Sequence, residues 1–129
     1  MSRAGGAMRG LTWTGILLIL IVGAIHAIES TDYFSEATYL GWLFVANAVG
    51  AVVAAFGIYR GEAWGWGLGF LISAGAFIAY IVSRTVGLPG APGLAQESLF
   101  ETAGLISLII EALFVIAFVA WTFRRVTKA

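Results

Sequence analysis

The sequence predicts an all-α integral membrane protein, a four-helix bundle with both termini in the cytoplasm. Hydrophobic residues make up 60% of the 129 positions and charged residues only 11%, whereas a soluble domain carries roughly 25% charged residues. The mean hydropathy is +0.96. Such a chain has too little polar surface to cover a globule in water, so we expect a lipid bilayer to be its solvent and residues 1–129 to form a single membrane domain.

Four continuous apolar runs account for this hydropathy. They cover residues 11–28, 39–59, 64–83 and 99–123. A helix needs about 20 residues to cross the hydrocarbon core at a rise of about 1.5 Å per residue, and each run comes close to that length or exceeds it. The runs do not alternate between polar and apolar residues, as the strands of a membrane barrel do. Each run is therefore predicted to be a transmembrane helix.

The placement of positive charge predicts the orientation. Six cations fall on one side of the predicted membrane: Arg3, Arg9, Arg60, Arg124, Arg125 and Lys128. Only Arg84 falls on the other side, and Trp64 and Trp66 are expected at the interface on the cation-rich side. Positive loops stay inside, which predicts a multi-pass protein of the inner (cytoplasmic) membrane. As an alternative, the first run is a secretory signal cleaved near Ala24 or Ala27.

The connections and small residues predict how the helices pack. Small residues recur every four positions in two of the runs, at Ala46, Gly50 and Ala54 and at Gly65, Gly69 and Ser73. Because small residues allow close helix contact in lipid, these two helices are expected to form a hairpin, with a homodimer face as the alternative. Residues 29–38 are expected to be an exposed acidic loop. Residues 85–98, which contain two prolines, are expected to cover the outer end of the bundle or to lie among the headgroups.

Glu111 is the leading functional candidate, because an ionisable group inside the membrane is costly. It lies about 18 Å from the outer end of its predicted helix, and it shares a face with Glu97, Glu101, Gly104 and Ser107. Asn47 and Ser73 fall at about 14 and 16 Å on their own helices. This layer predicts a proton or ion relay or a polar pocket that opens outward. The alternative is a Glu111 carboxyl that bonds to Asn47 or a serine and only fastens the helices together.

Two further residues are candidates near the outer surface. His26 is expected about one turn inside the end of its helix, on the same face as Glu29. It is interpreted as an interfacial histidine, and the alternative is a haem held by one His26 from each of two chains. Arg84 follows the third run, where a cation suits the helix dipole and can extend to the interface. Its alternative role is to pair with Glu29, Glu36, Glu97 or Glu101, or to hold an anion.

Other functional classes are disfavoured by composition. The chain has no cysteine, which excludes disulfides, thiolate nucleophiles and iron–sulfur clusters, and its single histidine excludes a histidine-rich metal site within one chain. The net charge of zero gives no basic surface for nucleic acid. No nucleophile and base occur at a useful spacing, so we do not expect an enzyme.

The segment SRTVGLPG at residues 83–90 resembles a signature of an uncharacterised family of small four-helix membrane proteins from archaea and actinobacteria. A histidine near the end of the first helix and Tyr39-Leu40-Gly41 at the start of the second are also similar. The resemblance spans about residues 25–111, although many members have an aromatic residue in place of Gly90. It implies the four-helix fold and no activity.

Taken together, these features predict a non-enzymatic membrane protein that binds a partner, a lipid or a small ligand. One alternative is a proton- or ion-coupled translocator that uses Glu111. The other alternative is a dimeric haem-binding redox protein that uses His26.

Overall fold

Four long helices build the fold in the computed structural model, which describes residues 3–128. They are α1 (Arg3–Glu36), α2 (Thr38–Tyr59), α3 (Ala63–Thr85) and α4 (Thr102–Lys128), with a short 3-10 helix, η1 (Pro92–Gln96), between the last two. All four long helices are long and apolar enough to cross a membrane. The predicted all-α membrane bundle is therefore confirmed.

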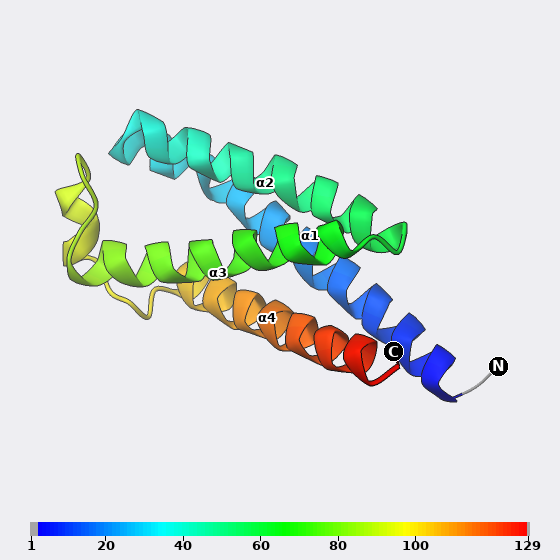
Figure 1. The fold of residues 1–129 in the computed structure, drawn as a ribbon. Helices are drawn as coiled ribbons and strands as arrows, with labels where there is room; N and C mark the ends of the chain where they lie inside the picture. Colours follow the sequence, from blue (N-terminus) through cyan, green and yellow to red (C-terminus); the bar gives the residue numbers. More distant parts are fainter. Residues whose placement is uncertain (1–2, 129) are drawn as a thin grey trace.

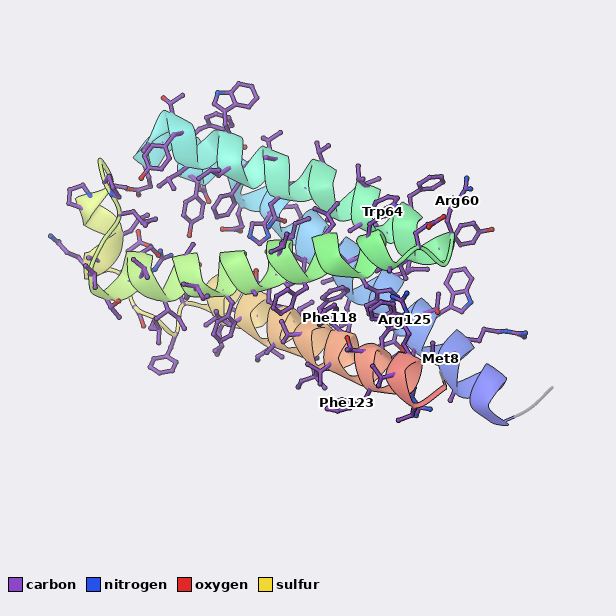
Figure 2. The ribbon with its side chains drawn as sticks, viewed as in Figure 1. Met8, Arg60, Trp64, Phe118, Phe123 and Arg125 are labelled. Atoms are coloured by element: carbon purple, nitrogen blue, oxygen red, sulfur yellow. The ribbon has the colours of Figure 1, made fainter. Side chains whose placement is uncertain are left out.

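The two ends of the bundle differ in charge. Helix α1 begins, α2 turns into α3 and α4 ends at one end, while the α1–α2 and α3–α4 connections lie at the other (Figure 1). Arg60 and Arg125 lie at the first end, which we call the basic end (Figure 2). The second end, which we call the acidic end, carries Glu29, Asp32, Glu36, Glu97 and Glu101.

Helix α1 is much longer than the predicted segment 11–28. It continues through residues 29–36, so the acidic loop expected there is wrong. This stretch holds no glycine or proline, and the Ser30 hydroxyl donates to the Ala27 carbonyl at 2.8 Å. The end of an apolar run marks where the chain leaves lipid, not where the helix must end. Only Ala37, with φ −162° and ψ 137°, separates α1 from α2. Cleavage near Ala24 or Ala27 would cut α1 in its middle.

The other helices lie closer to their predicted bounds, and the connection between α3 and α4 covers the end of the bundle as predicted. Helix α4 begins three residues later than predicted and continues five residues further. Residues 86–101 fold over the acidic end, where Ala91 and Leu94 are buried against Leu40. Gly87 and Gly90 have φ values of 95° and 73°, which non-glycine residues rarely adopt, and they allow the sharp turns on either side of Pro89. The apolar residues of this connection therefore form a small core of their own.

The main apolar core occupies the basic half of the bundle. Trp66 is 2% exposed and stacks on Phe114 and Trp121, with ring centroids 5.6 and 5.4 Å apart. Its side chain therefore faces the interior of the bundle. Ile58 and Phe114 are fully buried in the same cluster. Tight aromatic packing therefore joins α3 and α4 here.

Glycine contacts determine which helices stay together. A methyl group on Gly65 would clash with the backbone of Gly57 and Ile58, so α2 and α3 touch at the basic end as the predicted hairpin requires. The small residues of α3 do not all face α2, because Gly69 faces Phe114 of α4. Nearer the start of α2, Ala51 packs on Gly23 of α1. Helices α2 and α3 therefore diverge toward the acidic end (Figure 1).

Candidate functional site

A cavity of about 390 Å³ fills the space that the diverging helices leave in the acidic half. All four long helices contribute to its lining, and most of the lining side chains are apolar. The apolar walls include Ile25, Leu40, Leu43, Phe44, Leu71 and Ile72. The polar residues Glu29, Tyr33, Tyr80, Ser83 and Glu101 line the side toward the acidic end.

Glu111 lines the opposite, inner side of this cavity. It lies nine residues into α4, or about 14 Å along the helix, and it is 1% exposed. Ser107 donates a hydrogen bond of 2.9 Å to Oε2, whereas Oε1 is buried without a partner. Ser107 lies one turn earlier on the same helix, so this bond does not join two helices. The interpretation of Glu111 as a bond between helices is therefore not supported by its hydrogen bonding.

His26 of α1 faces Glu111 across the bundle. Its Nδ1 lies 2.8 Å from the Val22 carbonyl oxygen, and its Nε2 lies 3.8 Å from Glu111 Oε2. The carbonyl accepts a hydrogen from Nδ1, so the neutral ring presents a lone pair at Nε2. The separation of 3.8 Å is too long for a hydrogen bond, and it leaves both groups available to a ligand or a water molecule.

The predicted place of His26, about one turn inside the end of its helix, is wrong, because the residue lies ten positions before the end of α1. Its side chain is buried in the bundle, with 6% of the residue exposed. Its ring packs on Phe44 with centroids 4.8 Å apart. Its Nε2 is directed into the bundle toward Glu111.

Asn47 and Ser73 complete the predicted polar layer, but only one of them reaches the cavity. Four buried side-chain atoms in the described part of the chain have no hydrogen-bond partner: Asn47 Oδ1, Ser73 Oγ, Arg84 Nε and Glu111 Oε1. Asn47 lines the cavity, while Ser73 is fully buried outside its lining. The cavity therefore combines apolar walls with two unpartnered acceptors, on α2 and α4.

Arg84 ties several segments together at the acidic end. Its Nη2 lies 3.2 Å from a Glu97 carboxylate oxygen and 3.4 Å from a Glu101 carboxylate oxygen. The same nitrogen donates to the Tyr33 hydroxyl at 3.1 Å. The guanidinium carbon lies 4.6 Å from the centre of the Tyr80 ring. The Arg84 side chain is only 1% exposed, so its extension to the interface is wrong and pairing with Glu97 and Glu101 is what the structure shows.

A second cavity, of about 380 Å³, lies outside this arginine cluster, and we call it the vestibule. Arg84 and Leu94 contribute to its lining, together with five carboxylates: Glu29, Asp32, Glu36, Glu97 and Glu101. Glu29, Tyr33 and Glu101 line both cavities. The vestibule therefore meets the inner cavity at these three residues.

Sequence reasoning missed the contribution of Tyr33. The residue was expected in a loop, yet it lies seven positions after His26 on the same helical face and lines both cavities. Its ring stacks on Phe44 with centroids 3.9 Å apart. The absence of glycine and proline from residues 29–36 was the signal that could have placed it.

Comparisons with protein-family models, with curated proteins and with solved structures found no match. Within residues 3–128, no three histidine, aspartate or glutamate residues are grouped so that they could hold a metal ion. The two cavities and the side chains between them are the features of the molecule that bear on its function.

Proposed function

We propose that this multi-pass membrane protein is a non-catalytic binding protein that takes an amphiphilic small molecule into the inner cavity. The observation that carries the proposal is the pairing of apolar walls with Glu111 Oε1 and Asn47 Oδ1, two buried acceptors without partners. Buried polar atoms are nearly always hydrogen-bonded, and a molecule that reaches these two atoms would supply the donors that they lack. The volume of about 390 Å³ falls in the lower part of the range for ligand pockets.

The bilayer supplies the route by which such a molecule would enter. Leu43 of α2 and Leu71 of α3 line the cavity and are 58% and 67% exposed on the lipid-facing surface. Gly75 also lines the cavity, and a methyl group added there would meet nothing within 4 Å. An amphiphile dissolved in lipid could pass between the diverging α2 and α3 without crossing a polar surface.

One pair of variants tests this binding site. Gly75→Phe places a large ring in the opening, whereas Gly67→Phe makes the same change on the same helix outside the cavity lining, where a methyl group also meets nothing within 4 Å. The probes are octylamine, octanol and octanoic acid, added to protein in lipid nanodiscs. A ligand that binds only the folded state raises its melting temperature in a saturable way.

We expect at least one probe to stabilise the wild-type protein and the Gly67→Phe variant saturably, and we expect Gly75→Phe to abolish that effect. The proposal fails if no probe produces a saturable shift. It also fails if Gly75→Phe responds as the wild-type protein does.

The orientation of the chain belongs to the same proposal. Arg9, Arg60, Arg124 and Arg125 belong to the basic end, which supports a cytoplasmic position for both termini and an outward-facing vestibule in the cytoplasmic membrane. Because the chain has no cysteine, single cysteines report orientation without background. A membrane-impermeant maleimide on intact cells should label Ser35→Cys at the acidic end and spare Thr127→Cys. Labelling of Thr127→Cys alone would reverse the orientation.

A proton-coupled translocator is the second candidate. The observation that favours it is the facing pair of His26 Nε2 and Glu111 Oε2 at 3.8 Å, which the inner cavity joins to Glu29 and Glu101 of the vestibule. So small a carrier would need a homodimer to supply its second half. The test is the dissipation of a pH gradient in proteoliposomes. Flux that Glu111→Gln abolishes would support transport, and the absence of flux in the wild-type protein would reject it.

A further inference from the structure

The amphiphile that fits the inner cavity is, we infer, a lipophilic amine bound as its ammonium ion. This inference rests on the proposed binding function and names the chemistry of the ligand's polar head. Three kinds of observation carry it: the hydrogen-bonding character of the inner end, the charge of the cavity lining and the aromatic rings in the wall.

The inner end of the cavity offers acceptors. Glu111 Oε1 and Asn47 Oδ1 are buried without partners, and His26 in its neutral form would present the lone pair of Nε2. Two donors at this end are already used, because Ser107 bonds to Glu111 and the His26 Nδ1 hydrogen bonds to the Val22 carbonyl. A primary ammonium group carries three donors and no acceptor, so it complements this set of atoms. A carboxylate head would add only further acceptors.

The charged side chains that line the inner cavity have the same sign. Among the described residues, no lysine or arginine lines this cavity, whereas Glu29, Glu101 and Glu111 do. Arg84 lines only the vestibule, and its Nη2 lies within 3.4 Å of both Glu97 and Glu101. Clefts lined by one sign of charge concentrate ions of the opposite sign. A cation is therefore favoured in the inner cavity, and an anion is opposed.

The walls also suit a cation that carries an apolar body. Tyr33, Phe44 and Tyr80 line the cavity, and the faces of aromatic rings attract cations. The aliphatic side chains that reach the lipid surface would take up the tail. A buried carboxylate without a countercharge is costly in lipid, and a bound ammonium ion would supply that countercharge. The imidazole of His26 is the ionisable group that faces Glu111 from α1, and it would compete for this role.

The test compares three ligands with the same eight-carbon body: octylamine, octanol and octanoic acid. Each is titrated into the wild-type protein, Glu111→Gln and Glu62→Gln in nanodiscs, and binding is followed by the saturable shift in melting temperature. Glu111→Gln keeps the shape of the side chain and an acceptor for Ser107. Glu62→Gln makes the same change in the exposed α2–α3 turn at the opposite end.

We expect octylamine to bind the wild-type protein about tenfold more tightly than octanol, because hydrogen bonds to charged groups exceed neutral ones by that order. Glu111→Gln should weaken octylamine by about the same factor and leave octanol unchanged. Glu62→Gln should bind like the wild-type protein, and octanoic acid should not bind.

Two results would overturn the inference: equal affinities of the wild-type protein for octylamine and octanol, or an octylamine affinity that Glu111→Gln leaves unchanged. In both cases, the proposed binding function would still stand if Gly75→Phe abolished the binding that is observed. If no ligand binds saturably, the binding function itself fails. If the Glu111→Gln variant does not fold, the affinities of the wild-type protein for octylamine and octanol still test the inference.

Discussion

The basic half and the acidic half of this bundle are built from the same four helices, yet one is packed and the other is hollow. In the basic half, Ile58 and Phe114 are fully buried and Trp66 is 2% exposed. In the acidic half, two cavities of about 390 and 380 Å³ lie next to each other. The composition of the helices alone does not explain this contrast, because apolar residues dominate both halves.

The contrast shows that different forces hold the two halves. At the basic end, the glycine contact between Gly65 and Gly57 lets α2 and α3 touch, and aromatic rings fill the remaining space. At the acidic end, polar bonds hold separated segments in place. Arg84 joins Tyr33 to the carboxylates of Glu97 and Glu101. The acidic half can therefore remain open without falling apart, which a binding cavity requires.

The largest difference should appear when an aromatic residue is removed from each half. Phe114→Ala should lower the free energy of unfolding by about 3–5 kcal/mol, because it leaves a void in a close-packed core. Phe44→Ala should cost distinctly less, about 1–2 kcal/mol, because that ring already borders a cavity. Reversible unfolding in mixed micelles measures both variants. Equal losses would contradict the packed and hollow description.

A smaller effect is expected at the cluster that closes the acidic end. Arg84→Gln removes a buried guanidinium from Tyr33 and two carboxylates, and it should cost about 1–3 kcal/mol. The loss stays moderate because Glu97 and Glu101 are 47% and 45% exposed and can be solvated. Arg60→Gln is the matched control in the exposed α2–α3 turn and should change stability by less than about 0.5 kcal/mol. If the two variants lose equally, polar bonds do not hold the acidic end.

The smallest effect on stability is expected at Glu111. Glutamine retains an acceptor for Ser107, and the other carboxylate oxygen has no partner to lose, so Glu111→Gln should alter the free energy of unfolding by about 1 kcal/mol or less. The same unfolding assay measures it beside Phe114→Ala. A loss as large as that of Phe114→Ala would make Glu111 a structural residue and remove the reason to regard it as a ligand group.

Much of the fold could be predicted because apolar runs report directly which segments cross lipid. The bounds of α2 and α3 lie within two residues of the predicted ones. The end of α1 could not be found this way, because hydropathy changes at Ile28 while the helix continues to Glu36. The burial of Trp66 could not be found this way either, because it depends on the packing of α4 against α3.

The candidate site was predictable in its residue types and not in its contacts. The cost of a carboxyl in lipid singled out Glu111, and the helical repeat placed Ser107 beside it. The approach of His26 to Glu111 depends on how α1 packs on α4, and no local pattern encodes that pairing. The burial of Arg84 likewise depends on Tyr33, which belongs to the part of α1 that hydropathy did not reveal.

Cysteine labelling on α2 tests the central claim most directly, because the chain has no cysteine of its own. Asn47 lines the inner cavity, whereas Ala54 lies seven residues further along the same helix and is 0% exposed in the packed half. A small water-soluble maleimide should label Asn47→Cys in native membranes and leave Ala54→Cys unlabelled until the protein is denatured. Equal labelling of the two positions, or labelling of Ala54→Cys alone, would contradict a hollow acidic half above a packed basic half.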